Sequence, residues 1–313
     1  MNQPTVSIYL PTFNHEAYVV RALDSILMQQ TDFSYEVLIG EDCSTDTTRQ
    51  VLEDWQENHP DPRFHFFFRQ ENMHRQPVTN ALDLKQRCTG KYIICLEGDD
   101  YWTDPLKLQT QVDFLESHPD YYAVAHNCIV VGADSEPNGE TYPQCHDSEY
   151  TFRHYANDIL PGQFTTLLSR NYMTDPELDR SLLQPHRGPG DRNLYFTLLY
   201  HGRIHCIQQT MSAYRHIAKE GSSYSATVRY RYDTEEFAHR CRLEYAYRHK
   251  DPQGIRCAEH LYLRNVRNAL QHRHIGLKRA LADLKHMRHK PRQLLLLLKR
   301  DLCHKLLRKE LSF

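Results

Sequence analysis

The chain has 313 residues, of which 40% are hydrophobic and 25% are charged, and its formal net charge is −2. These values are typical of a soluble globular protein and argue against nucleic-acid binding through bulk positive charge. The nine cysteines form no Cys-x-x-Cys pair, which argues against a disulfide framework and a structural zinc site, and no apolar run reaches the roughly 20 residues of a membrane helix. We therefore expect a cytoplasmic protein that does not span a membrane.

Strands and helices alternate along the N-terminal third of the chain. Short apolar runs predict strands at 6–10, 36–39, 64–68 and 92–95, and apolar residues at helical spacing predict helices at 17–30, 47–58 and 78–88. This alternation is typical of βαβ units with a mostly parallel sheet. The later pattern predicts a helix at 104–117, a strand at 122–131, a polar loop at 135–150, a helix at 193–200, a strand at 204–207 and helices after residue 230, while 164–169 fits either a strand or a helix start.

Three polar clusters follow three of the predicted strands, namely Pro11 to Asn14, Glu41 to Asp46, and Glu97 to Asp100. The carboxyl ends of parallel strands meet at one edge of a sheet, and α/β proteins bind ligands there. We therefore expect the three clusters to lie together at one edge of the sheet.

The third cluster is the acidic run Glu97-Gly98-Asp99-Asp100, which follows the strand at 92–95. Three carboxylates on four residues repel one another, and a divalent cation that prefers oxygen ligands, Mg²⁺ or Mn²⁺, would offset that repulsion. Such an ion keeps open positions that substrate phosphates commonly fill. The run therefore predicts a site for a phosphate-bearing donor, and a solvated acidic turn is the alternative.

The order of these clusters resembles that of the family-2 inverting glycosyltransferases, which have the GT-A fold. That family commonly shows Pro-x-Tyr-Asn, Asp-Asp-Gly-Ser-x-Asp and Asp-x-Asp-Asp, where this chain has Pro-Thr-Phe-Asn, Glu-Asp-Cys-Ser-Thr-Asp and Glu-Gly-Asp-Asp. The likeness continues through Trp102 to Leu108 and Gly190-Asp191, and it covers residues 5 to 216. It implies a metal-dependent hexosyl- or N-acetylhexosaminyl-transferase that uses a nucleotide sugar, with a UDP-sugar preferred, in surface-polysaccharide synthesis of the bacterial type.

The resemblance implies a donor-binding role for residues of the first two clusters. Pro11, Thr12 and Asn14 match the loop that holds the nucleoside, and Asp42 matches the acid that reads the base. The residues on either side of this acid, Glu41 and Cys43, replace the usual Asp and Gly. These departures bear on the identity of the donor more than on the activity.

The resemblance also implies roles for the later acids. Asp100 is assigned as the direct metal ligand, with Asp99 near the ribose or the metal, and Asp191 as the catalytic base. Glu97 replaces the first acid of the metal motif, so its carboxylate reaches one methylene further. A base within hydrogen-bond reach of the acceptor hydroxyl accelerates a single displacement about 10²–10⁴-fold. A plain helix N-cap is the alternative role of Asp191.

Further side chains are weaker candidates for the same site. Trp102 could stack on the acceptor sugar or pack in the core, and His216 could bind near the diphosphate and the metal. Asn80 fits a helix residue better than a donor contact, and His126 and Asn127 lie at the end of a strand near the site.

We expect an α/β GT-A domain over 1–220, Rossmann-like with a mixed, mostly parallel sheet flanked by helices. Residues 1–110 would form the nucleotide-sugar half and 111–220 the acceptor half, followed by a helical C-terminal extension at 221–313. From Lys250 to Phe313 there are 16 Lys and Arg against 5 Asp and Glu, so this extension is basic.

Residues 293–311 carry a leucine stripe flanked by Lys and Arg. Such a basic amphipathic helix can lie on an anionic membrane surface, which would suit a lipid-linked acceptor and a peripheral position on the inner face of the membrane. A helix that packs on the domain or on a second protomer is the alternative.

Two other functions remain open at this stage. A catalytically idle glycan-binding or scaffold protein could have the same fold, although the intact Asp99, Asp100 and Asp191 argue against it. A sugar-phosphate nucleotidyltransferase usually has a Gly-rich, basic loop after the first strand, and residues 11–16 contain no Gly, Lys or Arg. The sequence leaves open the donor sugar, the acceptor, the choice between Mn²⁺ and Mg²⁺, and the oligomeric state.

Overall fold

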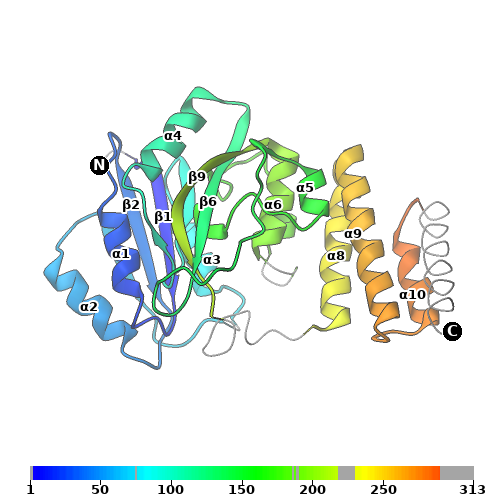
Figure 1. The fold of residues 1–313 in the computed structure, drawn as a ribbon, viewed down its shortest axis with the longest axis horizontal. Coiled ribbons are helices and arrows are strands. Elements are labelled where there is room, and N and C mark those ends of the chain that lie inside the picture. The colour runs from blue at the N-terminus through cyan, green and yellow to red at the C-terminus, as the bar shows by residue number, and fades with distance from the viewer. Residues whose placement is uncertain (1–2, 75, 185–186, 188–189, 218–229, 290–313) are drawn as a thin grey trace. The chain divides into compact units, whose positions relative to one another are not determined.

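The computed structural model describes residues 3–74, 76–184, 187, 190–217 and 230–289, and the chain divides into two compact units (Figure 1). The first unit comprises residues 1–185 and 190–228, and the second comprises 186–189 and 229–313. The division at residue 220 stays a prediction of the sequence. The predicted amphipathic helix at 293–311 lies outside the described residues.

One mixed sheet forms the centre of the first unit, with the strand order β3-β2-β1-β4-β8-β6-β9-β5 and β7 paired to β9. The strands are β1 (Val6–Thr12), β2 (Tyr35–Glu41), β3 (Phe64–Phe68), β4 (Tyr92–Cys95), β5 (Tyr101–Trp102), β6 (Tyr121–Val131), β7 (Glu149–Tyr150), β8 (Leu168–Arg170) and β9 (Arg203–Arg215). The four strands β3, β2, β1 and β4 are parallel to one another, and β6 and β9 also pair in parallel. β8 lies between β4 and β6 and is antiparallel to both. The predicted mixed α/β sheet is confirmed.

Helices of the first unit flank this sheet (Figure 1). They are α1 (Val19–Leu27), α2 (Thr48–Asn58), α3 (Asn80–Arg87), α4 (Lys107–Ser117), α5 (Phe152–Ala156) and α6 (Gly190–His201). Ile8 and Leu10 of β1 lie in one buried cluster with Leu23 of α1. The intervening Tyr9 points to the other face, where Lys85 of α3 lies over its ring. Figure 1 shows α1 and α2 beside β1 and β2.

Three short elements and most of one long strand were not predicted from the sequence. The short ones are β5, β7 and α5, and the strand predicted at 204–207 extends over Arg203–Arg215. Gln208, Gln209 and Thr210 interrupt the apolar pattern of β9, and the pairing of β6 with β9 shifts register at this point. A β-bulge therefore lets the strand continue through a polar stretch.

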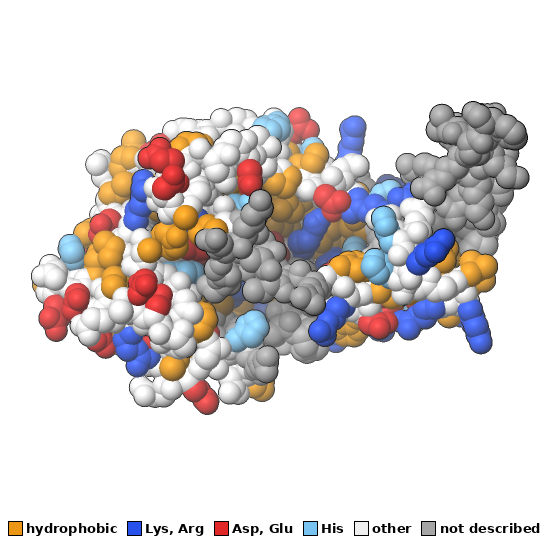
Figure 2. All heavy atoms as spheres, turned by 60° about the horizontal axis from the view of Figure 1, so that its bottom comes forward, with side chains coloured by type: hydrophobic (Ala, Val, Ile, Leu, Met, Phe, Trp, Pro, Cys, Tyr) orange, Lys and Arg blue, Asp and Glu red, His pale blue; other side chains and the backbone are white. Residues whose placement is uncertain are grey.

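The second unit is helical, as expected, with α8 (Tyr232–His249), α9 (Pro252–Gln271) and α10 (Leu277–Asp283). Asp251 caps α9 by accepting a hydrogen bond from the backbone of Gly254, and Pro252 occupies its first turn. Lys, Arg and His side chains gather over this unit in Figure 2. The exposed ones include Arg248, Lys250, Arg256, Lys278, Arg279, Lys285 and Arg288. None of the described helices is long and apolar enough to cross a membrane.

Candidate active site

The three polar clusters meet at the carboxyl edge of the parallel strands, as the sequence predicts. Thr12 at the end of β1 is in register with Glu41 at the end of β2. The next backbone amides continue the alignment, because Asp42 N donates to Thr12 O at 3.0 Å and Gly98 N donates to Pro11 O at 3.3 Å. The loops after β1, β2 and β4 therefore lie side by side.

Asn14 joins the first loop to the second. Its backbone is in the left-handed region, with φ of 57°, which an Asn side chain tolerates better than most. Its Oδ1 accepts a hydrogen bond from Thr45 N at 2.8 Å, and its own N donates to Ser44 Oγ at 3.0 Å. The observed contacts of Asn14 therefore hold the loops together, and its donor-binding role stays a prediction.

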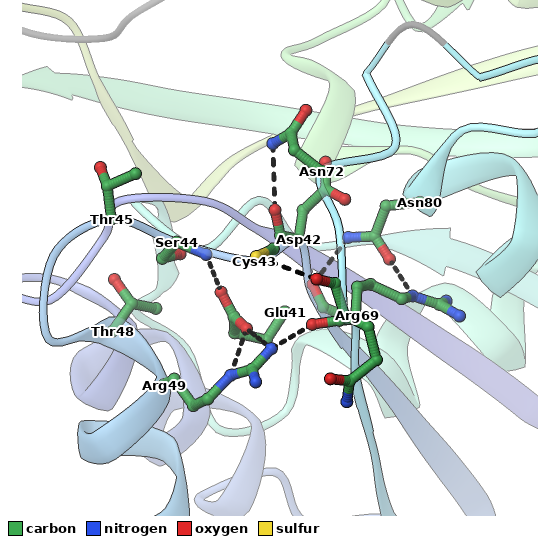
Figure 3. A network of polar contacts seen from close by, with 12 residues as sticks. Glu41, Asp42, Cys43, Ser44, Thr45, Thr48, Arg49, Arg69, Asn72 and Asn80 are labelled. Carbon is green, nitrogen blue, oxygen red and sulfur yellow. Dashed lines mark hydrogen bonds and ion pairs between the residues drawn. The ribbon is translucent and has the colours of Figure 1, made fainter.

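Glu41, which replaces the usual Asp, is the centre of the network in Figure 3. Its buried carboxylate accepts from Ser44 N at 2.5 Å and from Nε and NH2 of Arg49 at 2.9 and 2.8 Å. Arg49 NH2 also donates to the backbone oxygen of Arg69. The longer side chain of Glu41 thus pairs with an arginine of α2 and fixes the loop after β2.

Asp42 is held next to this network (Figure 3). Its Oδ1 accepts from Met73 N at 2.8 Å, and its backbone oxygen accepts from Asn72 Nδ2 at 3.0 Å. Burial raises the pKa of Asp42, and the bond from Met73 partly opposes that shift. Cys43 has φ of 57°, so it adopts the left-handed backbone for which glycine is usual. The loop therefore keeps its shape despite the Gly-to-Cys departure.

Asn80 has a structural role, which agrees with the expectation that it is a helix residue. Its Nδ2 donates to Gly40 O at 2.8 Å, and its Oδ1 accepts from Arg69 Nε at 3.0 Å. It thereby ties α3 to the end of β2.

The segment Glu97 to Asp100 follows β4 and is called the acid loop below. It packs tightly on the loop after β1. A Cβ at Gly98 would lie 2.6 Å from Thr12 Oγ1 and 2.7 Å from His15 Nδ1, so only glycine allows this approach. Thr12 Oγ1 lies 3.1 Å from His15 Nδ1, and His15 Nε2 lies 3.9 Å from a carboxylate oxygen of Asp99. Burial lowers the pKa of His15, and the negative charge of Asp99 opposes that shift.

The two neighbouring aspartates face different surroundings. The side chain of Asp99 is 27% exposed, whereas Asp100 is 1% exposed. Asp100 Oδ1 accepts from Arg215 N at 2.8 Å, and its Oδ2 accepts from Thr165 Oγ1 at 3.4 Å. Burial and the charges of Asp99 and Glu97 raise the pKa of Asp100. Asp99 is therefore the more accessible carboxylate.

Glu97 lies on the side of the acid loop where Asp191 is found. Its Oε2 accepts from Gln163 Nε2 at 3.4 Å. Burial, together with the negative charges of Asp99 and Asp191, raises the pKa of Glu97 to about 7. The ammonium group of Lys85 interacts with both Glu97 and Asp191. Asp191 itself lies in the first turn of α6. The structure thus brings the predicted base near the acid loop.

Trp102 does not offer its ring to an acceptor, because it is 1% exposed and packs in the main core cluster. Its Nε1 donates to Thr165 O at 3.2 Å, and Lys107 Nζ lies 3.8 Å from its ring centre. The core alternative for Trp102 is confirmed.

His216 is partly exposed at the end of β9, where its Nδ1 lies 2.5 Å from Glu140 Oε2. Its metal-binding role stays a prediction. His126 is fully buried within β6, and its Nδ1 bonds to Asn127 O at 2.9 Å. Burial lowers the pKa of His126, so it acts as a neutral interior residue.

The sequence did not identify His15, Arg215 or Gln163 as site residues. His15 directly follows the Pro-Thr-Phe-Asn cluster, and this place in the sequence could have marked it as a site residue. Arg215 donates from Nε to Asp99 O at 2.9 Å, and Gln163 contacts Glu97, both across long stretches of chain. Only the fold reveals these two contacts.

The sequence predicted a divalent cation at the acid loop. Within the described residues, no three His, Cys, Asp or Glu side chains are arranged to hold a metal ion. Mg²⁺ commonly takes one or two carboxylates and completes its shell with water and substrate phosphates. The accessible carboxylate of Asp99 is suited to that arrangement.

The chain matches the model of the family described as "Glycosyl transferase family 2" over residues 7–171. The uncharacterized protein Rv1520 of Mycobacterium tuberculosis is 31% identical over 67% of this chain and 58% of its own length. The chain thus spans little more than half of that relative. The putative colanic acid biosynthesis glycosyl transferase WcaA of Escherichia coli K12 is 33% identical over 53% of this chain and 57% of its own length.

Two solved structures have a similar fold. TarS 1-349 of S. aureus in complex with UDP-GlcNAc superposes with a TM-score of 0.62 at 16% identity, over 90% of this chain and 81% of that one. The mannosyltransferase PcManGT of Pyrobaculum calidifontis, in complex with GDP-Man and Mn²⁺, gives 0.51 at 18% identity, over 97% and 81%. These likenesses agree with the GT-A-type sheet. Because the family model matches more than half of its residues, the chain belongs to glycosyl transferase family 2.

Proposed function

We propose that this chain is an inverting glycosyltransferase. It moves a hexose or N-acetylhexosamine from a nucleotide sugar, preferably a UDP-sugar, to a hydroxyl of a saccharide or lipid-linked saccharide. The meeting of Thr12, Asp42 and Asp99 at one edge of the sheet, with Asp191 close to Glu97, carries this proposal. The relative named for colanic acid biosynthesis supports a place in surface-polysaccharide synthesis. We propose that the chain acts on the cytoplasmic side of the membrane.

The loops after β1 and β2 hold the nucleoside in this proposal. Asp42 is fixed by the backbone of Met73, so its carboxylate is oriented before the donor binds. Preorganised polar groups lower the entropy cost of binding. Pro11, Thr12 and Asn14 shape the floor of the same site, because their loop is bonded to both neighbouring loops.

Asp99 holds the divalent cation, Mn²⁺ or Mg²⁺, in this proposal, in place of the buried Asp100. The cation, when bound, neutralises charge on the departing diphosphate. PcManGT with GDP-Man and Mn²⁺ supports a cation in this fold. Asp100 instead anchors the loop through Arg215 and Thr165.

Asp191 accepts the proton of the acceptor hydroxyl while that oxygen bonds to the anomeric carbon. The bond from this carbon to the diphosphate oxygen breaks at the same time, so the nucleoside diphosphate leaves and the anomeric centre inverts. Lys85 interacts electrostatically with both Asp191 and Glu97, so the proposed base has a lysine side chain as a neighbour.

The test is a panel of UDP-, GDP-, dTDP- and CMP-sugars, with and without Mn²⁺ or Mg²⁺. Binding is measured by titration calorimetry, and donor turnover by release of the nucleotide, which is CMP for a CMP-sugar and the nucleoside diphosphate for the others. We expect metal-dependent binding of one donor class. Asp191→Asn should bind that donor normally and lose about 10²–10⁴-fold in turnover. Absence of nucleotide binding across the whole panel would overturn the proposal.

A further inference from the structure

Two partly buried tyrosines lie next to the acid loop and outside the buried core. The rings of Tyr142 and Tyr214 are 5.5 Å apart between centroids, at an interplanar angle of 77°. His216 continues the row, with its ring 6.1 Å from that of Tyr214 at 20°. Neither tyrosine is among the buried core side chains, so core packing does not account for this aromatic row.

Both tyrosine hydroxyls lie within the electrostatic reach of the acids. Burial raises the pKa of Tyr142, and the negative charges of Asp191 and Glu97 raise it further. Burial also raises the pKa of Tyr214, as do the charges of Asp100 and Glu97. The backbone agrees, because Arg215, the residue after Tyr214, donates from N to Asp100 Oδ1 at 2.8 Å, and Tyr142 lies beside Tyr214.

The loop that carries Tyr142 is fixed at its start. Arg215, which also bonds to the acid loop, donates from NH2 to Ser135 Oγ at 2.8 Å and from NH1 to Ala133 O at 3.2 Å. The same guanidinium therefore positions both the acid loop and the loop of Tyr142.

The end of this loop is fixed as well. Gln144 Oε1 accepts from Cys128 N of β6 at 2.9 Å, and Cys145 N donates to Leu160 O at 2.7 Å. Tyr142 is thus held by neighbours on its C-terminal side. A ring that is already in place loses little freedom when a ligand binds, which favours binding.

We propose that Tyr142 and Tyr214 form a platform for the pyranose ring of the acceptor, which rests on the proposed glycosyltransferase function. A pyranose has a face of C–H groups and an edge of hydroxyls. The C–H face suits the negative face of a tyrosine ring, and the phenol hydroxyls can bond to the edge. Asp191, the proposed base, is among the charges that act on Tyr142.

The platform serves the acceptor, since the donor nucleoside occupies other loops. The nucleoside contacts proposed above come from the ends of β1 and β2, whereas Tyr214 lies in β9 and Tyr142 follows β6. The platform also takes the role that the sequence assigned to Trp102, whose ring is buried.

The test uses methyl β-D-glucopyranoside, methyl β-D-galactopyranoside and methyl N-acetyl-β-D-glucosaminide as probes, with UDP and Mn²⁺ present. Saturation-transfer NMR measures glycoside binding, and calorimetry measures UDP binding on the same samples. We expect saturation of the ring C–H protons of at least one glycoside. Tyr142→Ala and Tyr214→Ala should each weaken that binding about tenfold and leave UDP affinity unchanged.

The phenylalanine variants Tyr142→Phe and Tyr214→Phe should keep most of the glycoside binding, because they keep the ring. Tyr230→Ala, which removes an exposed tyrosine of the second unit, should change neither signal. Two outcomes would overturn the platform while UDP binding stays normal. One is that the native protein binds no glycoside, and the other is that the alanine variants bind the glycoside as well as the native protein does. Loss of UDP binding in the native protein would instead count against the proposed function.

Discussion

Arg215 binds the acid loop through its backbone and its side chain together. Its N donates to Asp100 Oδ1 at 2.8 Å, and its Nε donates to Asp99 O at 2.9 Å. The side chain is 4% exposed and lies over the ring of Tyr18 at 4.0 Å. One residue at the end of β9 therefore fixes the side chain of Asp100 and the backbone of Asp99, which are more than a hundred residues away in the chain.

Replacing Arg215 with Ala should lower the free energy of unfolding by about 3–5 kcal/mol, because the backbone oxygens of Asp99, Gly132 and Ala133 lose their charged donor. Urea unfolding of the whole protein, monitored by circular dichroism, measures this change in the free energy of unfolding. Arg203→Ala is the matched control. Arg203 is half exposed and pairs with Asp120 and Glu149 at the surface, so its loss should leave the free energy of unfolding almost unchanged. Equal losses in the two variants would contradict a special role for Arg215.

Asp99 and Asp100 should respond differently to conversion into asparagine. Asp99→Asn removes the accessible carboxylate and should weaken Mn²⁺-dependent UDP binding at least about tenfold, with little change in stability. Asp100→Asn keeps the shape of a buried side chain whose pKa is already raised, so it should retain most of that binding. Calorimetry with UDP, with Mn²⁺ or with EDTA, measures both. The reverse pattern would give the ligand role to Asp100, as the sequence suggested.

The strands and the convergence of the three loops were predictable because each depends on a local pattern. Apolar runs predict β1, β3 and β4 closely, and the polar clusters begin where these strands end. Parallel pairing of the strands is then enough to place the three loops at one edge of the sheet.

The roles of single acids depended on contacts that no local pattern contains. Asp99 and Asp100 are adjacent and identical in type, and only Arg215 and Thr165 distinguish them. The burial of Trp102 depends on pairing of the two-residue β5 with β9, far along the chain. Tyr142 and Tyr214 likewise come together through separate segments.

Lys107 should make stability depend on pH. It is fully buried, its Nζ has no hydrogen-bond partner among the residues that the structure describes, and burial lowers its pKa well below 10.5. The unfolded chain therefore binds more protons than the folded chain below pH 10.5, so the free energy of unfolding rises as the pH approaches that value. Lys107→Met should remove this slope and raise the free energy of unfolding at pH 7 by about 1–3 kcal/mol.

Urea unfolding of Lys107→Met and the native protein at pH 7, 8 and 9 measures both effects. Lys91→Met is the control, because Lys91 is half exposed and pairs with Glu116 at 2.6 Å. Its replacement should change the free energy of unfolding by no more than about 1 kcal/mol. An unchanged slope in Lys107→Met would show that Lys107 stays charged in the folded protein.

Gly98 should tolerate no side chain, because it lets the acid loop approach the loop after β1. The Cβ of Gly98→Ala would meet Thr12 Oγ1 at 2.6 Å and His15 Nδ1 at 2.7 Å, so one of the loops must move. Overpacking of this kind typically costs about 1–3 kcal/mol of stability. The displaced loop carries Asp99, so Mn²⁺-dependent UDP binding should also weaken at least about tenfold.

Calorimetry with UDP and urea unfolding measure the two effects of Gly98→Ala separately. Gly276→Ala is the control, because a Cβ there meets no atom within 4 Å. Gly276 caps α10 in the second unit, so this change should cost no more than about 1 kcal/mol and leave UDP binding unchanged. If Gly98→Ala bound UDP as the native protein does, close contact between the two loops would not be needed to position Asp99, and the donor site would have to lie on other residues of the edge.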